Sequence, residues 1–195
     1  MQIYELISNK LLSLHKIFID KPRNMNNKLK ITLLAVLISL SWCALHAQTT
    51  AKEPAKTLEI GQEAPDFTLA DNKGDSLSLS SLRGQYVVLD FWGTWCKWCI
   101  SGMPKMKEYY EKYAGKFEIV SIDVMDKKQK WLDYLANADM PWKQVRQTPF
   151  NMVSKLYYVK AYPSKFVIDP EGKIIKISAG EDKRFYSFLD DLFKE

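Results

Sequence analysis

Apolar residues in this chain alternate between continuous runs and stripes at helical spacing. Continuous runs at 87–92 and 117–123 predict buried strands, and runs at 165–168 and 173–177 predict a terminal hairpin. A helix between the first two strands makes a right-handed parallel unit, which predicts an α/β domain. Two helical stripes recur every three or four positions. They consist of Met103, Met106, Tyr109, Tyr110 and Tyr113, and of Phe185, Phe188, Leu189, Leu192 and Phe193.

Shorter patterns add elements around this unit. Alternating runs at 67–69 and 77–79 flank the turn residues Asp71-Asn72-Lys73-Gly74 and predict a hairpin near the start of the domain. Further elements are predicted between the second long strand and Pro163. They are a helix at 127–136, a short strand at 142–145 and a short helix at 151–157.

The first part of the chain has the pattern of an export signal. Met25 is followed by a short basic segment, an apolar run at 31–40 and small residues at 44–47, which are the three regions of a secretory signal peptide. We therefore expect translation to start at Met25, so that residues 1–24 are an upstream extension. Residues 25–47 are then a signal peptide or an N-terminal anchor. The apolar run is shorter than the roughly 20 residues that span a bilayer comfortably.

Three fates of this leader stay open. We expect cleavage after Ala47, and the alternatives are retention as a membrane anchor or acylation of Cys43. Trp42 fits a lipoprotein signal poorly, because a small residue is preferred before the acylated cysteine. Residues 48–58 are polar and alanine-rich and predict a flexible linker. Residues 59–195 remain as one domain that can bury its own core.

Removal of residues 1–47 changes the chemistry available to the chain. It takes away six basic and two acidic residues. The remaining 22 basic and 21 acidic residues give a net charge of about +1. It also removes Cys43 and both histidines, His15 and His46, so two cysteines and no histidine remain. A near-neutral charge argues against a nucleic-acid partner. The lack of histidine excludes Ser-His and Cys-His nucleophilic sites and deprives any metal site of its commonest ligand.

Cys96 and Cys99 are the candidate reactive residues. They lie where the strand at 87–92 ends and a helix begins, so the sulfur of Cys96 meets backbone N–H groups and the positive end of the helix dipole, which favour the thiolate. A structural disulfide is disfavoured, because its stabilisation grows with loop length and this loop is very short. A zinc half-site would need two more Cys or His ligands, which the following sequence lacks. We interpret the pair as a redox switch.

The residues around the pair support this interpretation. Asp90 is the one charged residue in the apolar strand, and an unpaired buried carboxylate should gain proton affinity. The alternative is an edge-exposed or water-bridged Asp90 without a chemical role. Lys97 lies between the cysteines and should favour the thiolate, while Trp98 places an apolar surface beside the sulfur. Trp95 belongs to the rim of the site.

The segment 91–99, with the sequence FWGTWCKWC, resembles the active-site signature of thioredoxin-fold thiol–disulfide oxidoreductases. Together with Gly61 and Ala64-Pro65-Asp66-Phe67, it resembles the secreted TlpA/ResA-like branch, from about Gly61 to the C-terminus. The resemblance implies an α/β, thioredoxin-like three-layer fold with a mixed central sheet flanked by helices. It also implies an N-terminal β-hairpin extension and an inserted element between the second core strand and a cis-proline.

The second signature of this fold is Ala161-Tyr162-Pro163-Ser164. The resemblance implies a cis bond before Pro163, which would face the cysteines across the substrate groove. Tyr162 departs from the Thr, Val or Ile that members usually carry there, and this leaves the shape of the groove open. The resemblance also implies that Asp90 is a proton acceptor for Cys99.

The implied function is an exported oxidoreductase of a periplasm-like compartment or cell envelope. The Cys96 thiolate would attack a partner disulfide and Cys99 would resolve the mixed disulfide. Cys96 precedes the helix and should be the more exposed thiol, whereas Cys99 lies inside its first turn and should be shielded. We expect protein disulfides as substrates, a membrane protein as electron donor, a reducing direction and a monomer. We expect no metal, nucleotide or flavin cofactor. The residues expected to contact the substrate are Trp95, Trp98, Tyr162 and Pro163.

Other functions remain as alternatives. A thiol peroxidase shares the N-terminal segment, but the P-x-x-x-T-x-x-C motif of peroxiredoxins is missing before Cys96 and Cys99. A copper-binding module of the secreted thioredoxin-like type would need a CxxxC motif and a histidine. A disulfide-donating oxidase would use the same cysteines in the opposite direction.

Overall fold

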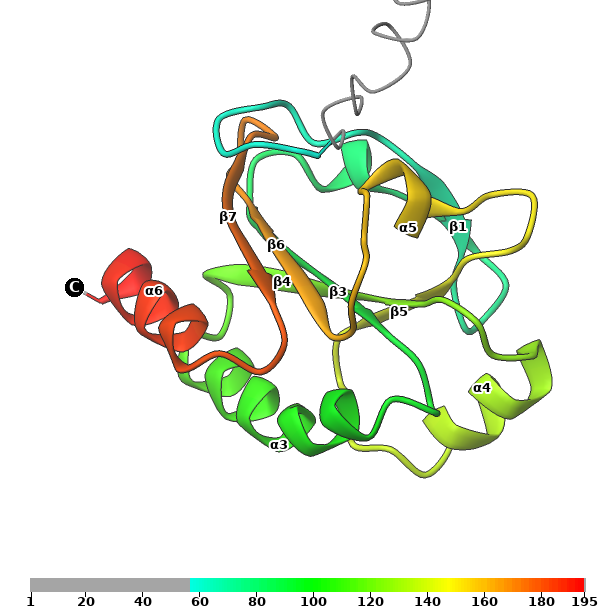
Figure 1. The fold of residues 1–195 in the computed structure, drawn as a ribbon. Coiled ribbons are helices and arrows are strands. Elements are labelled where there is room, and N and C mark those ends of the chain that lie inside the picture. The colour runs from blue at the N-terminus through cyan, green and yellow to red at the C-terminus, as the bar shows by residue number, and fades with distance from the viewer. Residues whose placement is uncertain (1–56, 195) are drawn as a thin grey trace, which may run out of the picture. The chain divides into compact units, whose positions relative to one another are not determined.

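The computed structural model describes residues 57–194. The predicted upstream extension at 1–24, the predicted signal peptide or anchor at 25–47, and residues 48–56 of the predicted linker lie outside the described residues. The described part contains the whole set of strands and helices expected for the domain (Figure 1).

A five-stranded mixed sheet forms the centre of the domain. Its strands are β3 (Tyr86–Trp92), β4 (Phe117–Asp123), β5 (Lys143–Arg146), β6 (Ser164–Ile168) and β7 (Ile174–Ala179). The spatial order is β5-β4-β3-β6-β7, so β3 is the central strand. It pairs parallel with β4 and antiparallel with β6. The predicted parallel unit, the short strand after it and the terminal hairpin are all confirmed.

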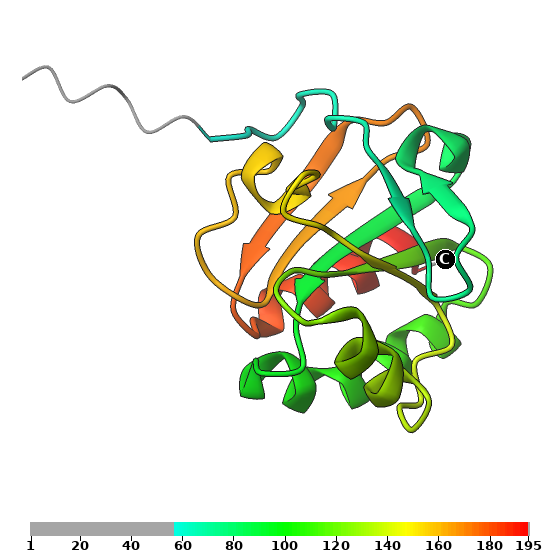
Figure 2. The same cartoon turned by 90° about the vertical axis from the view of Figure 1, so that its right-hand side faces the viewer.

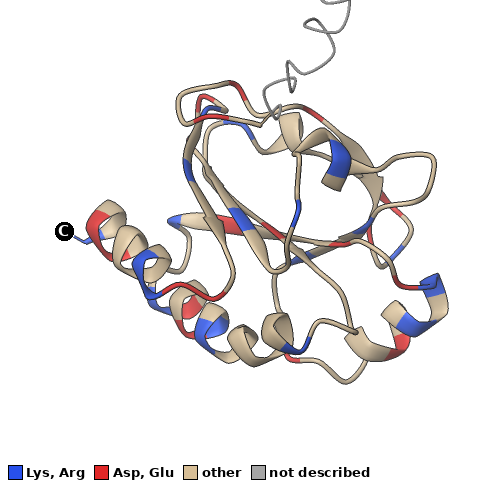
Figure 3. Ribbon diagram, viewed as in Figure 1, with Lys and Arg blue, Asp and Glu red and all other residues tan. Residues whose placement is uncertain are grey.

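Three helices cover one face of the sheet (Figures 1 and 2). They are α3 (Lys97–Lys112), α4 (Lys128–Leu135) and α6 (Lys183–Phe193). Parallel pairing of β3 and β4 requires a crossover between them, and α3 provides it. The buried side chains of α3 and α6 pack against Val88, Ile119 and Val167 of the sheet. Charges of both signs are interspersed along the outer sides of these helices (Figure 3).

The opposite face is covered by the N-terminal segment and a short helix. The segment contains β1 (Thr68–Ala70), β2 (Ser76–Ser78) and the 3-10 turn η1 (Leu79–Leu82), and the helix is α5 (Val153–Leu156). β1 and β2 pair antiparallel, which confirms the predicted hairpin. The helix predicted at 151–157 is shorter in the structure, because Asn151 forms a bridge with Thr148 before the helix begins.

Alternation along the strands divides the core between the two faces. Val87, Leu89 and Phe91 of β3 face the N-terminal hairpin and α5, whereas Val88 faces α3 and α6. Asp90 follows the same alternation and therefore lies on the helix-covered side of the central strand. The end of β3, the start of α3 and the start of β6 meet at one end of the sheet, where the cysteines lie (Figure 1).

Candidate active site

Cys96 and Cys99 lie at the beginning of α3 and form a disulfide with a Cα–Cα distance of 5.3 Å. Cys96 is the N-cap residue of the helix, and its sulfur accepts a hydrogen bond of 3.2 Å from the backbone N–H of Cys99. The helix N-terminus thus supplies both a donor and the positive end of its dipole to this sulfur. The cysteines pack against the buried indoles of Trp92 and Trp131.

The two cysteines differ little in accessibility. We expect from the sequence that Cys96 is the exposed thiol and Cys99 the shielded one, but Cys96 is only 6% exposed and Cys99 4%. In the disulfide-bonded pair both sulfurs lie in the same cluster with Trp92 and Trp131, which covers them about equally. The expected contrast is therefore not a property of this oxidised form.

Aromatic side chains surround the cysteines at the surface. Trp98 is 71% exposed and Trp95 43% exposed. The Trp95 indole packs edge-on against the ring of Tyr162 with 5.3 Å between centroids. A Cβ atom at Gly93 would lie 2.4 Å from the indole nitrogen of Trp95, so the glycine leaves room for this ring. The loop before the cysteines and the segment before β6 are thus brought together.

The other predicted residues of this region take the following positions. The Tyr162–Pro163 peptide bond is cis, and Pro163 is buried directly before β6. Tyr162 is half-buried, and besides the contact with Trp95 it packs against the cysteine cluster. Lys97 is exposed on the first turn of α3. All of these residues lie within the same end of the domain.

Asp90 is buried on the central strand, directly opposite Lys165 of β6. One carboxylate oxygen lies 3.8 Å from the Lys165 ammonium, and the other accepts a hydrogen bond of 3.3 Å from the Ser121 hydroxyl. Burial raises the pKa of Asp90 above its ordinary value, while Lys165 and Ser121 act in the opposite direction. The raised proton affinity agrees with the expectation from the sequence. The edge-exposed alternative is wrong.

An acidic pair, Asp123 and Asp126, holds the loop before Cys96. The Asp126 carboxylate accepts hydrogen bonds from the backbone N–H and the hydroxyl of Thr94, at 2.6 and 2.7 Å. Asp123, at the end of β4, is completely buried, and burial followed by the neighbouring Asp126 raises its pKa to about 8. Burial also acts to raise the pKa of Asp126, but hydrogen bonds from Asp123, Thr94 and Lys130 outweigh it and lower the pKa to about 2. The pair thus holds one proton and one charge near neutral pH.

Comparison with known proteins identifies the family. The sequence model of the AhpC/TSA family matches residues 60–177, more than half of the chain. Thiol-disulfide oxidoreductase ResA of Bacillus thuringiensis subsp. konkukian is 33% identical over 156 residues, which cover 80% of this chain and 88% of that protein. ResA of Bacillus subtilis is 32% identical over 149 residues, 76% of this chain and 81% of that protein. The chain belongs to the ResA-like thiol–disulfide oxidoreductases of the AhpC/TSA family.

A solved structure supports the fold of this ResA-like enzyme. The thioredoxin domain of a thiol-disulfide oxidoreductase from Bacteroides vulgatus superimposes with a TM-score of 0.65 and 28% identity. The alignment covers 71% of this chain and all of that chain. The thioredoxin-like fold and the thiol–disulfide oxidoreductase class expected from the sequence are thereby confirmed.

Sequence reasoning missed two charged residues of this ResA-like site. Lys165 is 3% exposed, and its ammonium bonds the carboxylate of Glu181 at 2.7 Å, more closely than it approaches Asp90. Lys165 could have been found by the rule that singled out Asp90, because it is one charge within a buried strand. Glu181 follows β7 in a turn without periodicity, and no sequence signal marks it.

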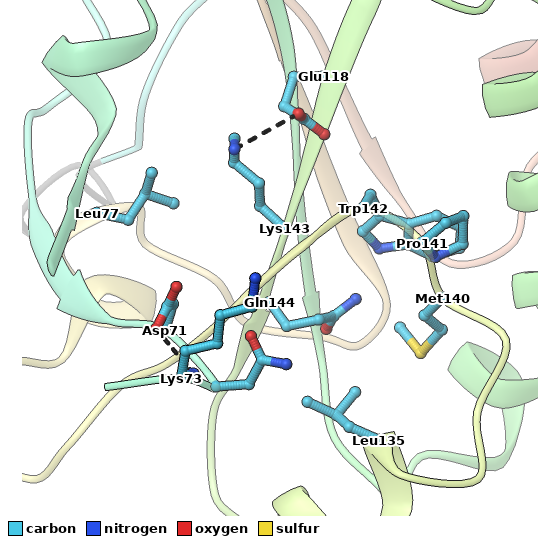
Figure 4. A pocket seen from close by; sticks show the side chains of 11 residues that line it. Asp71, Lys73, Leu77, Glu118, Leu135, Met140, Pro141, Trp142, Lys143 and Gln144 are labelled. Atoms are coloured by element: carbon cyan, nitrogen blue, oxygen red, sulfur yellow. Dashed lines mark hydrogen bonds and ion pairs between the residues drawn. The ribbon is translucent and has the colours of Figure 1, made fainter. Parts of the chain in front are cut away.

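A pocket of about 340 Å³ lies apart from the predicted site residues (Figure 4). It is formed by the β1–β2 turn, β5 and the segment after α4, and none of the predicted site residues lines it. The buried amide of Gln144 lies in its wall and has no hydrogen-bond partner within residues 57–194. The cysteines lie elsewhere, at the beginning of α3 in the cluster with Trp92 and Trp131.

Within residues 57–194, no group of three His, Cys, Asp or Glu side chains is arranged to hold a metal ion. None of the helices in this part of the chain is both long and apolar enough to span a membrane.

Proposed function

We propose that this oxidoreductase is exported and reduces disulfides of other proteins, with Cys96 as the nucleophile and Cys99 as the resolving cysteine. The observation that carries the proposal is the Cys96–Cys99 pair at the N-terminus of α3, beside the exposed indoles of Trp95 and Trp98. A helix N-terminus stabilises a thiolate at Cys96, and the thiolate is the attacking form. The exposed side chain of Lys97 adds positive charge on the same turn.

The exchange consists of two displacements. The Cys96 thiolate attacks one sulfur of the partner disulfide, a Cys96–partner disulfide forms, and the other partner sulfur leaves as a thiolate. The Cys99 thiol then loses its proton, and its thiolate attacks the Cys96 sulfur and expels the second partner thiolate. The partner gains two electrons, and the chain is left with the Cys96–Cys99 disulfide.

We propose that Asp90 accepts the proton that the Cys99 thiol loses. The carboxylate is buried, and its raised pKa brings its proton affinity closer to that of a thiol. Proton transfer is most effective when donor and acceptor have similar proton affinities. Asp90 lies six residues before Cys96 on the strand that leads into the site, which supports this role.

The partner protein would bind to the aromatic rim. Trp95 and Tyr162 pack on each other beside the cysteines, and Trp98 exposes most of its indole. Aromatic side chains of this kind contribute much of the free energy of protein–protein contacts. Pro163 lies directly before β6, where an extended partner segment can approach the pair. Substrates are therefore expected to be protein segments in extended conformation.

Export and electron supply complete the proposal. The signal-like residues 25–47 would bring the domain to a periplasm-like compartment or the cell envelope, where substrate disulfides persist. Because the reaction oxidises the cysteine pair, two electrons must be supplied for the next cycle, and we propose a membrane protein as their donor. Determination of the N-terminal residue of the protein isolated from cells tests whether the chain is cleaved after Ala47.

Cysteine variants test the assignment of nucleophile and resolving residue. Cys99→Ser keeps the attack and removes the resolving step, so mixed disulfides with partner proteins should accumulate in the exported fraction. Cys96→Ser is the matched control and should trap few or none. Equal trapping by the two variants would show that the roles are assigned wrongly. Turnover with hydrogen peroxide but not with protein disulfides would favour the thiol peroxidase alternative.

A further inference from the structure

A carboxylate from a distant turn lies on the active-site helix. Glu181 comes from the turn between β7 and α6, and Gly102 is a buried residue of α3, three positions after Cys99. A Cβ atom added at Gly102 would lie 2.3 Å from Cδ and 2.3 Å from Oε1 of Glu181. The carboxylate therefore occupies the place of a side chain on the helix, one turn beyond Cys99. Only a glycine at position 102 leaves this space.

The same carboxylate is bound on its other side by a buried cation. Glu181 accepts a hydrogen bond of 2.7 Å from the Lys165 ammonium and one of 3.3 Å from the Tyr186 hydroxyl. The Lys165 ammonium lies 3.8 Å from Asp90, its partner across the β3–β6 register. One cation is thus shared by two carboxylates, and it lies closer to Glu181.

This cluster is not balanced in charge. With both carboxylates ionised, Lys165 compensates only one of two negative charges, and the side chains of Lys165 and Asp90 are 3% and 7% exposed. An uncompensated charge in such surroundings is costly, so the cluster is neutral when one carboxyl group holds a proton. How strongly the Lys165 ammonium stabilises the ionised form of Asp90 therefore depends on how strongly Glu181 attracts the same ammonium.

The groups that face the Asp90 cluster come from every neighbouring element. Ser121 of β4 donates to Asp90 and accepts from the Trp142 indole at 2.8 Å. The titratable and charged groups are Lys165 of β6, Glu181 of the turn after β7, Tyr186 of α6, and Tyr109 of α3, whose ring packs on Tyr186.

We propose that Glu181 is a positioning residue for Asp90: it draws the Lys165 ammonium toward itself, and Gly102 is the residue of α3 that makes room for it. The proposal rests on the proposed role of Asp90 as proton acceptor for Cys99. If Glu181 lost its charge, Lys165 would act on Asp90 alone and stabilise its ionised form. Asp90 would then be a weaker base toward the Cys99 thiol.

The test is a direct titration of the Asp90 carboxyl group. In the oxidised full-length domain with ¹³C-labelled aspartate, the Asp90 carboxyl signal is followed against pH and assigned by its loss in Asp90→Asn. Glu181→Gln keeps the volume and the acceptor of Lys165 but removes the charge. The Asp90 midpoint should fall by about one pH unit or more. Glu108→Gln, on the exposed side of α3, is the matched control and should leave the midpoint unchanged.

Gly102→Ala tests the same cluster without altering any ionisable group. Alanine favours the helix more than glycine does, so the variant should fold. Its methyl group would displace the Glu181 carboxylate, and the Asp90 midpoint should fall as in Glu181→Gln. A midpoint that stays or rises in Glu181→Gln overturns the proposal. A fall in Glu181→Gln without one in Gly102→Ala overturns the role of Gly102.

The titration is independent of the proposed function, because the oxidised protein performs no exchange. The pH profile of partner release from the Cys96 mixed disulfide is the second measurement. If the Asp90 midpoint falls and the pH dependence of partner release also shifts to lower pH, both proposals are supported. A lower midpoint with an unchanged profile supports the positioning by Glu181 and contradicts the role of Asp90 in the reaction.

Discussion

Asp123 shows how a single buried carboxyl group makes stability depend on pH. It is completely buried at the end of β4, one oxygen accepts a hydrogen bond from the Asp126 backbone N–H, and its pKa is about 8. The ordinary value of 3.8 applies to the unfolded chain. Because the folded value is the higher one, the folded protein binds the proton more tightly. The contribution of the Asp123 proton to the stability of the folded state is complete below about pH 4 and is lost as the pH rises toward 8.

We therefore predict that Asp123→Asn becomes more stable relative to the parent protein as the pH rises. The amide imitates the protonated carboxyl group and cannot ionise. Between pH 5 and pH 8, the difference in unfolding free energy should change by at least about 1 kcal/mol in favour of the variant. Urea unfolding at the two pH values measures it. Asp133→Asn, whose side chain is exposed on α4, is the control. A difference that does not vary with pH would show that Asp123 is ionised in the folded state.

Single residues of the site were predictable where they contrast with their own strand. Asp90 is an isolated acid among apolar neighbours, and the spacing of Cys96 and Cys99 at a strand–helix junction is equally local. The partner of Asp90 is not local, because Lys165 reaches it through antiparallel pairing of segments 75 residues apart. The contact of Glu181 with Gly102 depends on the packing of a turn against another helix, and no periodicity in the sequence contains it.

At the scale of elements, Gln147 links the end of β4 to α5. Its side-chain amide donates to the carbonyl of Val124 at 2.8 Å and accepts from the backbone N–H of Ser154 at 2.9 Å. The residue is buried, so no water replaces these bonds if the amide is lost. This one side chain thus forms hydrogen bonds with backbone groups at the end of β4 and in α5, which do not pair with each other directly.

We predict that Gln147→Ala destabilises the domain by about 2 kcal/mol. The substitution leaves a buried N–H and a buried carbonyl without a partner, and each such group costs about 1–3 kcal/mol. Urea unfolding at constant pH measures the loss. Gln129→Ala is the matched control, because Gln129 is exposed and bonds only Asp133 one turn away on α4. Its effect should stay within about 0.5 kcal/mol. Equal losses for the two variants would contradict the linking role of Gln147.

Long elements were predictable and short ones less so, for a physical reason. The strands β3 and β4 and the helix α6 carry seven or more residues of one pattern, and their apolar sides coincide with the buried sides. The four residues of α5 are too few to express a period. The beginning of α5 is determined by the Thr148–Asn151 bridge and by Gln147, which are tertiary features.

At the scale of the whole molecule, the direction of electron flow depends on the balance between the disulfide and the dithiol. Interactions that stabilise the Cys96 thiolate favour the reduced form and make the protein a stronger oxidant. The helix N-terminus acts in this sense, and so does Lys97, although its exposed charge is screened by water. When Asp90 is ionised, the carboxylates of Asp90 and Glu181 outnumber Lys165 and place negative charge behind α3, which acts against the thiolate. The two sets of charges oppose each other across the first turns of the same helix.

We predict a reduction potential near the reducing end of the range, roughly −230 mV or below, against about −120 mV for a strong oxidase. Equilibration of the domain with glutathione buffers of known ratio, followed by acid trapping of the thiols, measures it. Lys97→Gln should lower the potential further, by less than about 30 mV, because it removes only a screened interaction with the thiolate. A potential near that of a strong oxidase would reverse the proposed direction and make the protein a disulfide donor. In that case the substrates would be dithiols, and the Cys99→Ser variant, which cannot form the Cys96–Cys99 disulfide, would have none to transfer and would trap none of them.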